Sequence, residues 1–231
     1  MERYKKNLDL LKKNNVYSKD MEHDACGVGL VASTEGKKSR AVVDYGIQAL
    51  KAVWHRGAVD ADGKTGDGAG IHLEIPKDFF IEKIEITGHK FDNSEICVGM
   101  IFLPRNNFDA QETCRTIVES ELTKSNFNIY GWRQVPVNPS VLGEKAEFNR
   151  PEITQVLFKH NDKNEKGKSL EIKLYEARRK IEKKILYENL NEFYICSFSS
   201  KSIIYKGMFL AESLSDFYLD LKDPRFVSRY A

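Results

Sequence analysis

The sequence predicts a layered α+β or αββα domain, in which helices pack outside largely antiparallel sheets. Three observations support this prediction. Strand-like and helix-like segments alternate along the chain as strand, helix, strands, helix, strands, helix and hairpin. Successive strands lie close in sequence, which favours antiparallel pairing over a doubly wound parallel sheet. The 231 residues, of which 41% are hydrophobic, are enough to form one good core.

The first unit is expected to contain a strand, a helix, a loop and a second strand. The apolar run 27–32 ends at a polar turn and fits a buried strand. Between Ser39 and Trp54 apolar residues recur every three or four positions, which predicts a helix. Residues 60–70 are too rich in Gly and Asp for regular structure, whereas 71–75 alternate as a strand does. A loop is therefore expected between two rigid elements.

The later segments add strands, two helices and a hairpin. Strands are expected at three apolar segments, 97–103, 129–137 and 153–158. Asp109 is predicted to cap a helix with Glu112 as its reciprocating partner. A hairpin is expected from 193–197 and 202–205, turning through 199–201, with a short helix near Ser213.

A long amphipathic helix is predicted just before that hairpin. Its apolar face is formed by Leu170, Leu174, Ala177, Ile181 and Ile185. Its other face carries charged residues, among them Glu171 and Arg178, and is expected to be solvated.

The charge balance and the lack of targeting signals exclude several kinds of function. Lys and Arg number 36 against 34 Asp and Glu, so the net charge of +2 indicates no nucleic-acid partner. No segment reaches the ~20 apolar residues that a membrane helix requires. Residues 1–25 lack the apolar stretch of a secretory signal and the acid-poor composition of a transit peptide, so the expected location is the cytoplasm. The cysteines are far apart, which predicts neither a disulfide framework nor a zinc site.

Cys26 stands at the head of a glycine-spaced apolar run and is the candidate catalytic residue. If the chain is cut before it, the same residue carries a thiol and a free α-amino group. An α-amino group titrates at about 7.7 to 8.0 and a free thiol at about 8.5, so proton exchange between them needs little free energy near neutral pH. Residues 1–25 contribute few aliphatic side chains and form a mobile or weakly helical leader.

The alternative is that Cys26 is a small buried hydrophobe in a strand, because cysteine is among the most often buried residues. Three neighbouring features favour the chemical interpretation. Gly27 and Gly29 leave room for close backbone approach, the leader has little reason to pack, and an unusual loop lies in the next strand–helix unit.

His55-Arg56-Gly57 follows the first predicted helix. The Arg56 guanidinium suits a carboxylate or a developing oxyanion, and Gly57 is expected to cap the helix in left-handed geometry. The alternative is structural, because basic residues are favourable at helix C-termini. The loop 66–70 lacks the spacing of a phosphate-binding loop. We interpret it as a tight turn facing a small polar ligand, with a plain mobile loop as the alternative.

Several motifs in one order resemble the start of the large subunit of glutamate synthases. The resemblance rests on Ala25-Cys26-Gly27-Val28-Gly29, Trp54-His55-Arg56-Gly57-Ala58 and the segment 61–71. It continues in later segments, which are 131–137, 141–143, 151–156, 199–208 and 218–226. That part of the large subunit is a class II glutamine amidotransferase domain with the N-terminal nucleophile hydrolase fold. The resemblance thus implies a four-layer αββα sandwich for this chain.

The resemblance also implies a processed enzyme. Residues 1–25 would be a propeptide and 26–231 part of the amidotransferase domain. The Cys26 thiolate would attack the carboxamide of glutamine, release ammonia and leave a thioester for water to hydrolyse, while its α-amino group moves the protons. Arg56 and Gly57 would line the substrate pocket. No cofactor is expected in these residues, but the whole enzyme would pass ammonia to 2-oxoglutarate with the help of FMN and an iron–sulfur cluster. Its partners would be the remaining synthase domains and a small reductase subunit.

The sequence also departs from the family pattern. Trp54 and Asp60 stand where the resemblance leads us to expect other residues. The arginine that grips the substrate carboxylate and the Asn-Gly pair of the oxyanion hole would follow the point that matches Ala231. We therefore expect a C-terminally truncated domain that is inactive alone, because loss of one oxyanion donor costs about 100- to 1,000-fold in rate. Two alternatives stay open, an amidotransferase for another acceptor and a non-catalytic glutamine-binding module.

Overall fold

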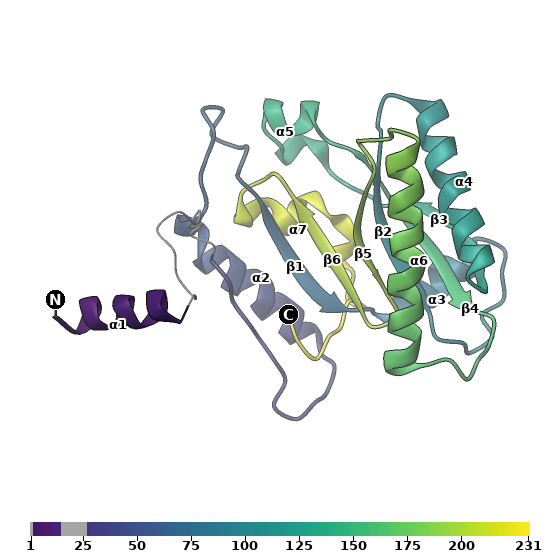
Figure 1. Cartoon of the computed structure of the whole chain (residues 1–231), viewed down its shortest axis with the longest axis horizontal. Coiled ribbons are helices and arrows are strands. Elements are labelled where there is room, and N and C mark those ends of the chain that lie inside the picture. The colour runs from purple at the N-terminus through teal and green to yellow at the C-terminus, as the bar shows by residue number, and fades with distance from the viewer. Residues whose placement is uncertain (1, 15–26) are drawn as a thin grey trace.

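The computed structural model describes residues 2–14 and 27–231, and most of its helices and strands are arranged in layers (Figure 1). The helices are α1 (Glu2–Lys13), α2 (Arg40–Ala52), α3 (Lys77–Ile86), α4 (Phe108–Lys124), α5 (Glu144–Phe148), α6 (Gly167–Tyr187) and α7 (Leu214–Phe217). The strands are β1 (Ala69–Glu74), β2 (Cys97–Leu103), β3 (Phe127–Gln134), β4 (Glu152–His160), β5 (Tyr194–Ser199) and β6 (Ser202–Gly207). Short 3₁₀ turns are η1 (Trp54–Arg56), η2 (Pro139–Val141), η3 (Ala211–Ser213) and η4 (Leu219–Lys222).

Two antiparallel sheets form the middle of the molecule. One has the strand order β3-β4-β2-β5, and the other pairs β1 with β6. The register places Val98 of β2 between Leu157 of β4 and Ser199 of β5, and Ile71 of β1 opposite Tyr205 of β6. The prediction of largely antiparallel sheets is therefore confirmed.

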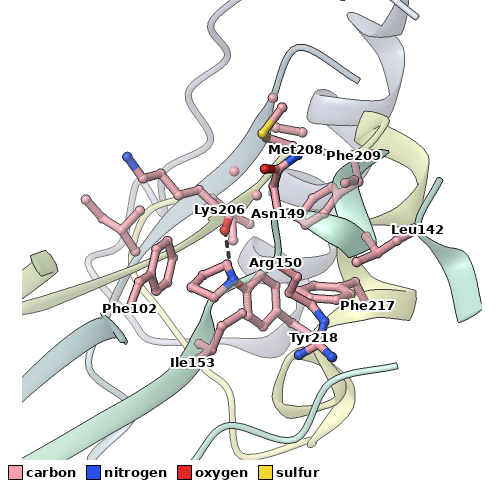
Figure 2. A pocket seen from close by; sticks show the side chains of 18 of the residues that line it. Phe102, Leu142, Asn149, Arg150, Ile153, Lys206, Met208, Phe209, Phe217 and Tyr218 are labelled. Atoms are coloured by element: carbon pink, nitrogen blue, oxygen red, sulfur yellow. Dashed lines mark hydrogen bonds between the residues drawn. The ribbon is translucent and has the colours of Figure 1, made fainter. Parts of the chain in front are cut away.

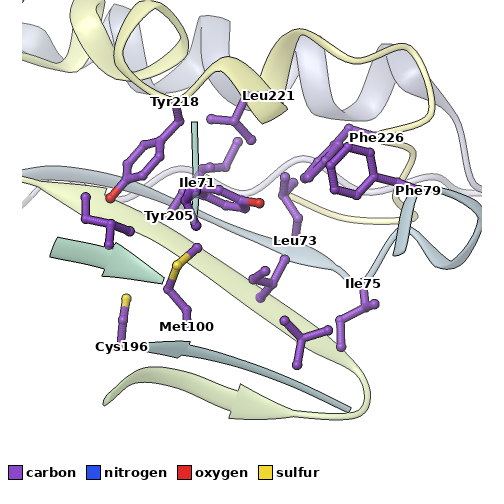
Figure 3. Packing of buried hydrophobic residues seen from close by; sticks show 14 of the residues in the cluster. Ile71, Leu73, Ile75, Phe79, Met100, Cys196, Tyr205, Tyr218, Leu221 and Phe226 are labelled. Atoms are coloured by element: carbon purple, nitrogen blue, oxygen red, sulfur yellow. The ribbon is translucent and has the colours of Figure 1, made fainter. Parts of the chain in front are cut away.

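The apolar core divides into two clusters that explain the layers. The first fills the space between the two sheets and extends to α2 and α7; Figure 3 shows Leu73, Met100 and Tyr205 within it. The second lies between the four-stranded sheet and the pair α4 and α6. The order of layers is thus α2 with α7, the β1–β6 sheet, the four-stranded sheet, and α4 with α6 (Figure 1). This is the mixed α+β, αββα arrangement that the sequence predicts.

Helix α6 confirms the predicted apolar face, since Leu170, Leu174, Ala177, Ile181 and Ile185 are all buried. The expectation that its charged face is simply solvated is wrong in part. Glu171 accepts hydrogen bonds from the turn that follows β5, and Arg178 Nη2 donates to the Ile195 carbonyl at 3.0 Å. These charges tie the helix to β5.

The predicted strand at 27–32 is not a strand of either sheet. Its pairing is limited to a short ladder with the last residues, in which Val31 and Ala231 exchange backbone hydrogen bonds of 2.9 and 2.8 Å. Val28 and Leu30 are 88% and 78% exposed, so the apolar run is not buried in this structure. An apolar run indicates burial only where a partner surface covers it, which the run itself does not specify.

The predicted hairpin is also corrected. The turn lies at 199–201 as expected, but β5 pairs with β2 whereas β6 pairs with β1. The chain therefore crosses from one sheet to the other at this turn. The helix that follows is present as α7, next to Ser213.

The predicted cap of α4 is wrong by two residues. Asn107 is the N-cap, and its Oδ1 accepts a hydrogen bond from the Ala110 backbone N–H at 3.0 Å. Asp109 instead lies in the first turn of the helix. Asn and Asp are both good caps, so composition alone does not choose between them.

None of the helices in the described part of the chain is both long enough and apolar enough to cross a membrane.

Candidate functional site

A cavity of about 580 Å³ lies where four segments of the sequence meet. We call it the glycine cavity, because five glycines are among its lining residues. The lining residues are Gly27, Leu50, Val53, Trp54, Gly57, Ala58, Val59, Gly63, Asp67, Gly68, Ala69, Gly70, Phe209, Leu210, Ala211 and Glu212. The cavity thus joins the start of the apolar run, the end of α2 with η1, the Gly- and Asp-rich loop with the start of β1, and the segment 209–212 that follows β6.

The end of α2 brings Gly57 to the cavity. The helix begins at the N-cap Ser39, whose side chain accepts from the Val42 N–H, and passes through Val53 into η1. Gly57 then leaves the turn in extended geometry, with φ −93° and ψ 147°. The expected left-handed cap at Gly57 is therefore wrong.

The close approach of Asp67 favours glycine at position 57. A Cβ atom at this position would lie 3.2 Å from Asp67 Oδ1 and 3.5 Å from the Trp54 carbonyl oxygen. Because the residue has no side chain, the Asp67 carboxylate approaches the backbone of the His-Arg-Gly turn.

The Gly- and Asp-rich loop is more ordered than the alternative of a plain mobile loop suggests. Val59 and Gly66 form an antiparallel bridge, the Asp60 N–H donates to the Thr65 carbonyl at 2.9 Å, and the Asp67 N–H donates to Ala58 at 3.3 Å. The two arms of the loop therefore hold each other, and the second arm leads directly into β1.

The predicted site residues are only partly placed. Cys26 lies outside the described residues, but the next residue, Gly27, lines the glycine cavity. Arg56 belongs to η1 and precedes Gly57, which lines the same cavity. The structure therefore brings Gly27 and Gly57 to one cavity, although they are 30 residues apart in the chain.

Sequence reasoning missed part of the lining. Asp67 lies in the Gly- and Asp-rich loop, for which no role of this side chain was predicted. The segment 209–212 has no recognisable sequence pattern and runs from the end of β6 into η3. Gly66 shows how that segment is held. A Cβ at Gly66 would lie 2.7 Å from the Phe209 carbonyl oxygen, so backbone packs on backbone there.

The other three cysteines are core residues. Burial raises the pKa of Cys114 and of Cys196 to about 11, and it raises the pKa of Cys97 further. All three are free thiols. Because the thiolate is the nucleophilic form, none of them is suited to catalysis at neutral pH.

A second cavity, of about 630 Å³, shares the lining residues Asp67 to Gly70 with the first. Figure 2 shows its largely apolar lining, which includes Phe102, Leu142, Ile153, Phe209 and Phe217. Some polar groups of the lining already form hydrogen bonds with each other, since the Tyr218 hydroxyl donates to the Lys206 carbonyl at 2.7 Å. Residues 67–70 and Phe209 thus line both cavities.

Comparison with known proteins agrees with the fold and the motifs. Residues 26–231 match the family model of the class II glutamine amidotransferases. The chain therefore belongs to this enzyme family, whose domain has the N-terminal nucleophile hydrolase fold.

Within the family, the similar proteins are glutamate synthases. The chain is 54% identical over 228 residues to the glutamate synthase (NADPH) large chain of Azospirillum brasilense, covering 99% of this chain and 15% of that relative. It is 39% identical over 211 residues to ferredoxin-dependent glutamate synthase 2 of Synechocystis, covering 91% and 13%. It is also 38% identical over 212 residues to ferredoxin-dependent glutamate synthase 1 of Arabidopsis thaliana, again covering 91% and 13%. The chain therefore spans about one seventh of the length of these relatives.

Proposed function

We propose that this chain is part of the glutaminase domain of a glutamate synthase, and that the domain at its natural length hydrolyses glutamine to glutamate and ammonia. We also propose that residues 1–25 are removed as a propeptide, which makes Cys26 the first residue of the mature chain. One observation carries the proposal. Gly27, the residue after Cys26, lines the same cavity as Gly57 and the loop Gly68–Gly70, so the family's motifs converge on one hollow.

The chemistry follows from the two groups that Cys26 would carry. Its α-amino group takes the thiol proton, and the sulfur forms a bond to the carboxamide carbon of glutamine. The C–N bond then breaks as the ammonium group returns the proton to the leaving nitrogen, which departs as ammonia and leaves a γ-glutamyl thioester. Water attacks the thioester carbon and gives its proton to the amine. The C–S bond breaks, glutamate leaves, and the proton returns to sulfur.

Arg56 and Gly57 are proposed to line the substrate pocket. Gly57 supports this role by position, since it lines the cavity and a side chain there would crowd Asp67. The guanidinium of Arg56 offers planar donors for a substrate oxygen.

The reaction of the whole protein is proposed from its relatives. The ammonia would be transferred to 2-oxoglutarate by other synthase domains, with electrons supplied through a small reductase subunit, in the cytoplasm. FMN and an iron–sulfur cluster would belong to those domains. Among residues 2–14 and 27–231, no group of three or more His, Cys, Asp or Glu side chains is placed to hold a metal ion.

The test is ammonia release from glutamine by the protein at its natural length. Cys26→Ala is expected to abolish the reaction, because it removes the nucleophile. Cys196→Ala is the matched control, because this buried thiol lies in the core and away from the glycine cavity, and it is expected to keep most of the activity. Equal ammonia release by the wild type and Cys26→Ala would refute the assignment. Arg56→Lys with an unchanged rate and an unchanged half-saturating glutamine concentration would leave Arg56 as a helix-end charge only.

A further inference from the structure

We infer that Asp62 and Thr65 are positioning residues that fix one wall of the glycine cavity by holding the Gly- and Asp-rich loop against α5. The inference rests on the proposed glutaminase function. Asp62 and Thr65 do not line the cavity themselves, and they act by positioning the backbone of the loop that does.

Asp62 closes the loop on itself. Its Oδ1 accepts hydrogen bonds from the backbone N–H groups of Lys64 at 2.9 Å and Thr65 at 2.7 Å. Its Oδ2 accepts from the Thr65 hydroxyl at 2.6 Å. These hydrogen bonds lower the pKa of Asp62 to about 2, and the bond from the Thr65 hydroxyl has the largest effect. The carboxylate is therefore ionised at neutral pH. A carboxylate that accepts several bonds from one short turn fixes the shape of that turn.

Thr65 fastens the closed loop to α5. It is 2% exposed, and its Oγ1 accepts a hydrogen bond from the Ala146 backbone N–H at 3.3 Å. No side chain of α5 or of its N-cap residue Gly143 caps that helix. The loop therefore supplies the acceptor that the first turn of a helix requires.

The fit between loop and helix is close. A Cβ atom on Gly143 would lie 2.1 Å from Asp62 Oδ2 and 2.4 Å from Thr65 Oγ1. Any residue other than glycine at 143 would therefore push the loop away. A second tie joins the same two segments, because Lys145 Nζ lies 2.7 Å from Asp60 Oδ2.

The docked loop leads straight into the cavity wall. Gly66 follows Thr65 and packs its backbone on Phe209, and Asp67 follows with its N–H on the Ala58 carbonyl. Asp67 and Phe209 both line the glycine cavity. A shift at Thr65 is thus transmitted to the wall within two residues.

The loop contributes little to the core, so its role can be tested without unfolding the protein. Residues 61–64 are exposed, and neither apolar cluster contains a residue of 60–66. Loss of the Asp62–Thr65 contact is expected to loosen the loop locally.

The experiment compares Thr65→Val with Thr65→Ser in the protein at its natural length. Valine keeps the shape and removes the hydroxyl, whereas serine keeps the hydroxyl. Lys64→Ala is the matched control, because the Lys64 side chain is exposed and only its backbone N–H takes part in the contact with Asp62. Hydrogen exchange of residues 58–70 is measured without substrate, and KM and kcat for glutamine are measured in parallel.

Thr65→Val and Asp62→Asn are expected to speed exchange in 58–70 and to raise KM about tenfold, with kcat changed less, since a shift of about 1 Å in a positioning group costs up to about 100-fold. Thr65→Ser and Lys64→Ala should stay near wild type. An unchanged rate of hydrogen exchange in Thr65→Val would overturn the claim that Thr65 holds the loop against α5. Faster exchange with an unchanged KM would overturn the positioning role. Failure of the proposed function would appear separately, as ammonia release that survives Cys26→Ala.

Discussion

Arg133 and Asp220 form a doubly hydrogen-bonded ion pair inside the molecule, with Nη1–Oδ2 at 2.7 Å and Nη2–Oδ1 at 2.9 Å. Their side chains are only 13% and 3% exposed. Gln155 Oε1 accepts another bond from Arg133 at 2.6 Å, and the Tyr205 hydroxyl donates to Asp220 at 3.0 Å. One polar network therefore joins β3, β4, β6 and η4. It fixes the position of the small sheet relative to the large one.

Arg133→Met is expected to destabilise the protein strongly, because it leaves the Asp220 carboxylate buried without its cation. Breaking a buried pair in this way costs about 3 to 5 kcal/mol. Arg179→Met is the control, since Arg179 is 63% exposed on α6 and exposed pairs contribute about 0 to 1 kcal/mol. Urea unfolding of both variants measures the difference. Equal unfolding free energies would show that the network is dispensable.

Glu171→Gln is expected to loosen the crossing between the sheets. Glu171 accepts bonds from the Ser199 hydroxyl at 2.9 Å, the Ser200 N–H at 2.8 Å and the Ser200 hydroxyl at 2.7 Å. Loss of charge-assisted bonds of this kind costs about 1 to 3 kcal/mol. Glu176→Gln, on the exposed face of the same helix, is the control. Thermal unfolding that does not separate the two variants would contradict this role.

The acid stability of the protein should depend in part on Asp223. Hydrogen bonds from the Arg225 side chain, at 2.9 and 2.7 Å, lower the pKa of Asp223 to about 2 from its ordinary value of 3.8. Glu82 and Lys83 face the same cluster. Because the pKa is lower in the folded state, the stabilisation is present above the unfolded pKa and is lost as pH falls from about 4 to about 2.

The comparison of wild type with Asp223→Asn checks this pH dependence. The wild type should be the more stable protein near neutral pH, and its advantage should shrink as pH falls through the window given above. An advantage that stays constant over this window would show that the ionisation of Asp223 does not contribute.

Gly57→Ala is expected to weaken glutamine binding while leaving the fold intact. The new methyl group would lie 3.2 Å from Asp67 Oδ1, inside the wall of the glycine cavity. Crowding of a close-packed site costs about 1 kcal/mol or more, which is about a fivefold rise in KM. Gly29→Ala is the control, because its methyl group would meet only Ala49 Cβ, at an ordinary 3.5 Å. Similar KM values for the two variants would remove Gly57 from the pocket.

Local sequence patterns predicted the positions of most helices and strands well. The errors concern strand pairing, which depends on residues that are distant in the sequence. The apolar face of α6 follows from its helical periodicity and the bounds of β2 from a continuous apolar run, and each of these patterns lies within the segment itself. The run 27–32 and the β5–β6 turn were misjudged, because pairing depends on Ala231 in one case and on β1 and β2 in the other. Helix α3 drew no prediction.

The candidate site shows the same division between local and distant signals. The motif residues Gly57 and Gly68 were identified from the sequence and lie in one cavity. The part of the lining at 209–212 has no local pattern, since backbone packing against Gly66 holds it in place. Asp62 and Thr65 likewise belong to a motif that was identified from the sequence. The residues of α5 and its N-cap that they contact lie about 80 positions further along the chain, so the motif alone does not reveal the contact.

The central claim is that Cys26 is both the first residue and the nucleophile of the mature chain. The most direct measurement is peptide mass mapping after reaction with a diazoketone analogue of glutamine, which alkylates the attacking sulfur. We expect one labelled peptide that begins at Cys26, with the label on sulfur and a free α-amino group. A labelled peptide that still contains Ala25, or a protein that carries no label on Cys26, would contradict it.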